Sequence, residues 1–70
     1  MPNPALTLLP AAEVTKRTSI SRTHIWRLVT AGEFPAPVKI VGRRSGWVES
    51  EVDDWIAERI AARDTGRGAA

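Results

Sequence analysis

The chain has 70 residues, no cysteine and one histidine, and its net charge is only +2. This length allows one small domain, and the composition excludes disulfide bonds and a metal site built from cysteine or histidine. We expect no enzyme, no cofactor, no metal ion and no small-molecule ligand, because so small a chain has no room for an enclosed catalytic site. No apolar run approaches the roughly 20 residues of a membrane span and no secretory signal opens the chain, so we expect a cytoplasmic protein without membrane contact.

The charged residues are divided between two parts of the chain. Residues 14–48 contain seven Lys or Arg and one acid, whereas residues 49–64 contain six acids and two Arg. The first part therefore has a net charge of +6 and the second a net charge of −4. A surface with such a positive excess attracts a polyanion, while the acidic part is expected to face solvent.

A loose arm, a short strand and a first helix are predicted at the start of the chain. The arm is residues 1–5, which contain two prolines and no periodic pattern. Residues 6–9, with three leucines and one threonine, form a short apolar strip that predicts a strand. Pro10 suits the first position of a helix, because its missing N–H needs no partner there. This helix is expected to run to about Arg17 with Val14 facing inward.

A second helix is predicted over residues 22–31. Ser21 is a good N-cap, because its hydroxyl can accept a hydrogen bond from a backbone N–H of the first turn. Three apolar residues recur at helical spacing and form the inward stripe: Ile25, Leu28 and Val29. Gly32 is expected to end the helix in the left-handed conformation, and Phe34 to fold back over the stripe.

A β-hairpin is predicted after the second helix. Residues 38–41 are β-branched and nearly alternating, which predicts a strand. Residues 42–46 are expected to form the turn, and residues 46–48 the return strand. The turn carries Arg43 and Arg44, so the hairpin has a doubly basic tip.

The third helix is predicted to end at about Arg63, where the domain of residues 6–63 also ends. Ser50 and Asp53 suggest a capping box at its start. Four apolar residues share its inward face: Val52, Trp55, Ile56 and Ile60. Trp55 and Trp47 are both expected in the core, and residues 64–70 are predicted to be a flexible tail. The predicted fold is thus small α+β, with three helices, a β-hairpin and a short N-terminal strand.

The first two helices, joined by a short turn, have the pattern of a helix-turn-helix, whose second helix enters the major groove of DNA. The inward stripe leaves Thr23, Arg27 and Thr30 on the opposite face, with His24 and Trp26 on the flanks. Arginine can bond bidentately to guanine, threonine can touch a thymine methyl group, and histidine can bond a base or a phosphate. An ordinary amphipathic helix would show a similar polar face, but Lys39 and the hairpin arginines add a second basic element that the core does not need. The candidate DNA-binding residues are Ser21, Arg22, Thr23, His24, Trp26, Arg27, Lys39, Arg43 and Arg44.

In order and spacing, these motifs resemble those of the AlpA family of phage-type regulators, which are relatives of the excisionases and of MerR-like winged helices. The matching motifs are "EV" in the first helix, "SRTHIWRL" in the second, "GEFPAPVKI" before the hairpin, and then "GW" and "ESEVDDWI". The resemblance implies a winged helix-turn-helix that binds DNA, with the second helix in the major groove and the hairpin wing on the backbone or minor groove. It assigns the helix role to Ser21, Arg22, Thr23, Trp26 and Arg27, and the wing role to Arg43 and Arg44.

Three positions depart from the family pattern. Ser19 stands in the turn where the family usually has glycine, which implies a tighter or differently capped turn. Trp26 replaces a common tyrosine, and either half-burial against the wing or contact with the DNA backbone fits this position. Thr30 replaces a frequent lysine and removes one possible phosphate contact.

Two DNA-binding roles and one role of another class remain open from the sequence. The first is a transcriptional regulator of a prophage or mobile element, and the second is an excision factor that bends DNA. The third is a protein-interaction module that uses the acidic helix of residues 50–63. For the DNA-binding roles we expect double-stranded DNA as the partner and a nucleoid-associated location. One short helix reads few base pairs, so we expect a monomer or weak dimer that assembles on repeated DNA sites.

Overall fold

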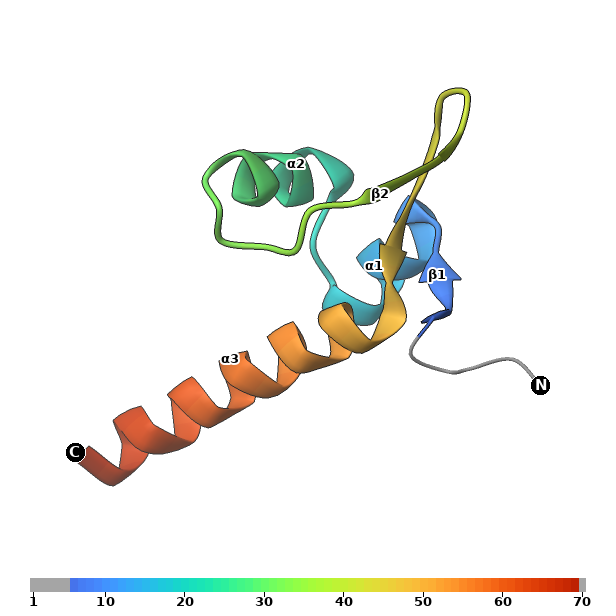
Figure 1. Ribbon diagram of the computed structural model, residues 1–70. Helices are drawn as coiled ribbons and strands as arrows, with labels where there is room; N and C mark the ends of the chain where they lie inside the picture. The colour runs from blue at the N-terminus through green and yellow to red at the C-terminus, as the bar shows by residue number, and fades with distance from the viewer. Residues whose placement is uncertain (1–5, 70) are drawn as a thin grey trace.

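The computed structural model describes residues 6–69 of the chain, with side chains for residues 6–66. The predicted arm, residues 1–5, lies outside the described residues. In chain order the elements are β1 (Leu8–Leu9), α1 (Ala11–Thr18), α2 (Arg22–Thr30), β2 (Val38–Val41), β3 (Arg44–Val48) and α3 (Glu49–Ala69) (Figure 1). These elements form the small α+β fold that the sequence predicts, and they have the arrangement of a winged helix-turn-helix.

The three strands form one antiparallel sheet in the order β1-β3-β2. Strand β1 pairs only with the end of β3, where Leu9 lies opposite Trp47. Strand β2 pairs with the earlier part of β3, from Val38 opposite Gly46 to Val41 opposite Arg44, with a bulge in between. The tip of the hairpin is therefore unsupported by β1 and projects from the body of the molecule (Figure 1).

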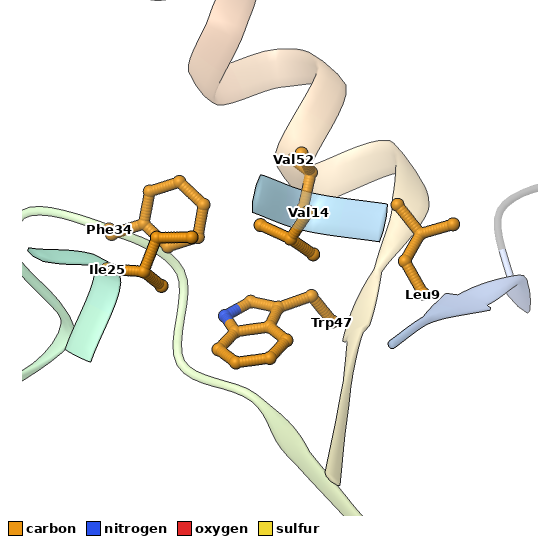
Figure 2. Close-up of a cluster of buried hydrophobic side chains, with 6 residues drawn as sticks. All are labelled: Leu9, Val14, Ile25, Phe34, Trp47 and Val52. Carbon is orange, nitrogen blue, oxygen red and sulfur yellow. The ribbon is translucent and has the colours of Figure 1, made fainter. Parts of the chain in front are cut away.

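The core is a single cluster to which six different segments each contribute one buried apolar side chain. The six residues are Leu9, Val14, Ile25, Phe34, Trp47 and Val52 (Figure 2). Trp47, from the central strand, is 1% exposed and lies between the helices and the sheet. Since a chain of this size buries only about 60% of its unfolded surface, each of these side chains is a large part of the stabilising burial.

The connection between α2 and β2 is held in place by two indole N–H groups. Trp47 Nε1 donates a hydrogen bond to the Pro35 carbonyl at 2.9 Å. Trp55 Nε1 donates to the Glu33 carbonyl at 2.8 Å, and its ring packs edge-to-face on Phe34 with centroids 4.9 Å apart. The predicted core position of Trp47 is confirmed, whereas Trp55 is only partly buried and packs against the cluster. These bonds fix the position of the wing relative to α2.

Helix α3 differs from its prediction at both ends. It begins at Glu49 directly after β3, so the predicted capping box is wrong and Ser50 lies within the first turn. The Glu49 N–H donates to the Thr7 carbonyl at 2.8 Å, a partner distant in sequence that takes the place of a local cap. The helix continues to Ala69, six residues past the predicted end, because Ala61 and Ala62 favour helix and no proline interrupts it.

The inward face of α3 is shorter than its apolar pattern predicts. Val52 is fully buried and Ile56 packs against the core, but Ile60 is 48% exposed. The prediction for Ile60 is wrong because the small core reaches only the first turns of this helix (Figure 1). The limits of the domain, residues 6–63, stay a prediction. Within residues 6–69, no helix is both long and apolar enough to cross a membrane.

The hairpin turn and the first strand are shorter than predicted. Only Gly42 and Arg43 connect the strands, and Arg44 already belongs to β3. The sequence misplaced this boundary because a small residue such as Ser45 fits a turn and a paired strand equally well. Strand β1 covers two of the four predicted residues, and Leu6 lies before it with 75% of its surface exposed.

Candidate nucleic-acid interface

Helix α2 has defined ends that its own sequence encodes. Ser21 caps the start, as predicted, and its Oγ accepts a hydrogen bond from the His24 N–H at 3.2 Å. At the other end Gly32 has a φ of 77°, and its N–H donates to the Val29 carbonyl at 3.0 Å. The Glu33 N–H then donates to the Leu28 carbonyl at 2.8 Å, which completes a Schellman motif. The helix is therefore a rigid platform of defined length.

The turn before α2 is held by a serine in the left-handed conformation. Ser19 has a φ of 63°, and its N–H donates to the Thr15 carbonyl at 2.8 Å. Next to it, the Thr18 hydroxyl donates to the Val14 carbonyl at 2.8 Å and accepts from the Ile20 N–H at 3.3 Å. The departure at Ser19 thus changes the residue but keeps a backbone conformation for which glycine is the usual choice.

The polar face of α2 is open to solvent. Ile25 is buried beneath the helix, and the predicted interface residues of α2 are all exposed: Ser21, Arg22, Thr23, His24, Trp26 and Arg27. The Thr30 hydroxyl donates to the Trp26 carbonyl at 2.9 Å, so its hydrogen is already used in a bond within the helix. The accessible polar groups nearest the middle of this face therefore belong to Thr23 and Arg27.

Trp26 joins α2 to the central strand of the sheet. Its ring meets the buried Trp47 edge-on, with centroids 5.5 Å apart and an interplanar angle of 60°. The residue as a whole is nevertheless 45% exposed. Half-burial, one of the two positions predicted for Trp26, is confirmed, and the exposed part remains available for a partner.

The wing presents three cations on a short, twisted hairpin. Lys39 and Arg44 lie on β2 and β3, Arg43 lies in the turn, and all three are exposed. Gly42 has a φ of 54° and a Cβ placed on it would meet no atom within 4 Å, so the turn leaves open space at the tip. The tip stands apart from α2, and both lie on the side of the molecule away from the C-terminal end of α3 (Figure 1).

The ion pairs of the protein are placed elsewhere. Within residues 6–66, Arg17 and Arg63 form the ion pairs, and no cation of the predicted interface takes part in one. Arg17 lies 3.0 Å from Glu49, 3.6 Å from Asp53 and 3.5 Å from Glu13, so it joins α1 to the start of α3. Desolvation tends to lower the pKa of Arg17, but its hydrogen bonds to Glu49 and Glu13 outweigh this effect and raise the pKa above its ordinary value.

The sequence does not predict this role of Arg17. Its i,i+4 spacing from Glu13 is a visible signal for a local pair. The pairs with Glu49 and Asp53 join residues more than 30 positions apart, and no local pattern indicates them. Among the residues with described side chains, the cations of the predicted interface thus form no ion pair, while the acids at the start of α3 are partly neutralised from α1.

Comparison with known proteins agrees with this arrangement. The family model described as "Prophage CP4-57 regulatory protein (AlpA)" matches residues 7–60, which include every element from β1 to the first half of α3. A protein of Enterobacteria phage P4, described as "Uncharacterized protein ORF88", is 41% identical in an alignment 69 residues long; the alignment covers 94% of this chain and 78% of the phage protein. No solved structure matches the chain. On the strength of the family match, the chain belongs to the AlpA family of prophage regulatory proteins.

Proposed function

We propose that the protein binds double-stranded DNA sequence-specifically and regulates transcription in a prophage or mobile element. The observation that carries this proposal is the set of exposed cations on α2 and on the wing that form no ion pair within residues 6–66. A folded domain that leaves such cations unpaired on two elements of one side has a surface suited to phosphates. Membership of a family of prophage regulators supports a regulatory use of that surface.

In the proposed complex, α2 lies in the major groove and the wing follows the flanking backbone. Arg27 and Thr23 contact base edges, because they lie opposite the buried Ile25. The start of α2, with Ser21 and Arg22, approaches a phosphate, since backbone N–H groups and a positive dipole end point outward there. His24 and Trp26 contact the groove walls from the flanks, and Lys39, Arg43 and Arg44 bind phosphates.

The test is the salt dependence of DNA binding. A duplex selected from a random pool serves as the probe, and its dissociation constant is measured over a range of salt concentrations by fluorescence anisotropy. The logarithm of the affinity should fall linearly with the logarithm of the salt concentration, with a slope of roughly −0.9 for each phosphate neutralised. Affinity that is absent or independent of salt overturns the proposal and favours a module that binds protein.

Three variants separate the proposed roles. Arg43→Ala should weaken binding to all duplexes alike and reduce the slope by about 0.9. Arg27→Ala should cost about 1–3 kcal/mol on the selected duplex and much less on an unrelated one. Arg63→Ala is the matched control, because Arg63 is an exposed arginine of α3 that pairs with Asp64. It should leave both affinity and slope unchanged.

A further inference from the structure

Most of the exposed large apolar side chains lie on or beside the two outer strands of the sheet. They are Leu6, Leu8, Val38, Ile40 and Val41, with exposures from 37% to 75%. Elsewhere within the described residues, Trp26 and Ile60 have comparable exposure, and each lies alone on its helix. Clustered apolar exposure of this kind indicates a surface that another molecule covers.

Several of these side chains share the face of the sheet that points away from the core. Leu9 and Trp47 point inward, so their neighbours Leu8 and Gly46 point outward. A Cβ placed on Gly46 would lie 3.0 Å from Ile40 Cδ1 and 3.3 Å from Leu8 Cβ, which shows that both side chains close over this glycine. We call Leu8, Val38, Ile40 and Gly46 the outer sheet face, with Val38 included because it pairs with Gly46.

A shallow groove continues this face toward the hairpin tip. It has a volume of about 230 Å³ and is lined by Leu8, Pro10, Ile40, Val41 and Arg44, among others. The lining contains a cation and no acid. A partner for this surface must therefore be apolar, and it must approach where the local charge is positive.

The bound DNA would leave the outer sheet face uncovered. Helix α2 lies on the opposite, inward side of β3, because Trp26 packs on the inward-facing Trp47. Strand β1 lies at the end of the sheet away from the hairpin tip (Figure 1), so DNA that meets α2 and the tip would approach the sheet from its other end. The base of the sheet therefore stays accessible to a protein surface.

We propose that the outer sheet face binds a second copy of this chain at a neighbouring site on the same duplex. This inference rests on the proposed function. The nine residues of α2 read only a few base pairs, so useful specificity needs several copies side by side. Lys39, Arg43 and Arg44 of two copies would repel each other in solution, but DNA phosphates neutralise them. The contact therefore forms on DNA and gives cooperative binding.

The experiment compares two threonine variants on two duplexes. Ile40→Thr removes apolar surface from the outer sheet face, and Ile60→Thr is the matched control, since these isoleucines are 50% and 48% exposed. One duplex is short enough for a single copy, and the other holds several copies in a row. On the long duplex the wild-type protein should bind cooperatively. Ile40→Thr should lower the cooperativity factor by about fourfold or more, which is the worth of one buried methylene group.

Both variants should bind the short duplex as the wild-type protein does. Val38→Thr, on the same face, should repeat the effect of Ile40→Thr and guards against a local folding defect. Independent binding of wild-type copies on the long duplex, or equal cooperativity in the Ile40 and Ile60 variants, overturns the inference. Weaker binding of Ile40→Thr to the short duplex also overturns it, because the face would then touch DNA. Failure of the wild-type protein to bind even the short duplex contradicts the proposed function instead.

Discussion

At the scale of single residues, the two positions with left-handed backbone that flank α2 are occupied by different residue types, a serine and a glycine. Gly32 takes a φ of 77° at the end of the helix, where glycine adopts this conformation without strain. Ser19 takes a φ of 63° before the helix, although a side chain there costs roughly 1–2 kcal/mol. Ser19 is exposed, and within the described residues its hydroxyl forms no hydrogen bond that offsets this cost.

Ser19→Gly should therefore stabilise the protein. Relief of the strained φ outweighs the larger backbone entropy of glycine in the unfolded chain, and the free energy of unfolding should rise by about 0.5–1 kcal/mol. Urea unfolding followed by circular dichroism measures the change. Gly32→Ala provides the comparison: a Cβ there meets no atom within 4 Å, so its loss of about 1 kcal/mol comes from the backbone alone. Equal or lower stability of Ser19→Gly would show that the serine is not strained.

Arg17 is the residue whose importance is clear only from the tertiary structure. Arg17→Gln should lower the melting temperature slightly at low salt, because the guanidinium no longer joins α1 to Glu49 and Asp53. The difference from the wild-type protein should shrink as salt is added, since these pairs are partly exposed and are screened. Arg63→Gln, which removes a pair with the adjacent Asp64, should have no measurable effect at any salt concentration.

At the scale of elements, the helix ends and core positions that were predicted correctly are those that depend on residues nearby in the chain. Ser21 and Gly32 mark the ends of α2 because capping uses backbone groups within four residues. The apolar period identified Val14, Ile25 and Val52 as core residues for the same reason.

The boundaries that failed depend on partners distant in the chain. Glu49 starts α3 because its N–H meets the Thr7 carbonyl, and Ile60 is exposed because, in the described part of the chain, the core takes from α3 only side chains of its first turns, up to Ile56. For the candidate interface, the sequence identified the exposed cations. It could not show that Arg17 forms an ion pair with Glu49 of α3, or that the Trp26 ring packs edge-on against Trp47.

The contact between Trp26 and Trp47 is a direct aromatic contact between α2 and the sheet. Trp26→Ala should lower the free energy of unfolding by about 1 kcal/mol, which is the worth of an edge-to-face aromatic pair. Trp26→Tyr keeps an aromatic ring at the contact and should lose less. Trp47→Ala removes the buried partner and should cost about 3–5 kcal/mol. A loss in Trp26→Ala as large as in Trp47→Ala would mean that the exposed ring belongs to the core.

At the scale of the whole molecule, the charges are separated between two surfaces. The exposed cations of the predicted interface lie on α2 and the wing, while Glu51, Asp54 and Glu58 line grooves between α3 and residues 32–36, one of which also contains Arg59. Within the described residues these three carboxylates form no ion pair. If DNA binds the cationic surface, these acids contribute only through long-range repulsion, which salt screens over about 10 Å at 0.1 M.

Neutralising these acids tests the orientation of the protein on DNA. The triple variant Glu51→Gln, Asp54→Gln, Glu58→Gln should bind DNA several-fold more tightly at low salt, and the gain should disappear as salt is added. The salt slope measured near physiological salt should stay unchanged, because the same phosphates are neutralised by the same cations. The loss of Glu51 from the first turn of α3 should cost a few tenths of a kcal/mol of folding stability, because its charge is favourable at the positive end of the helix dipole. Weaker DNA binding by the triple variant would instead place α3 at the interface, since only a direct contact could make the removal of negative charge unfavourable for binding a polyanion.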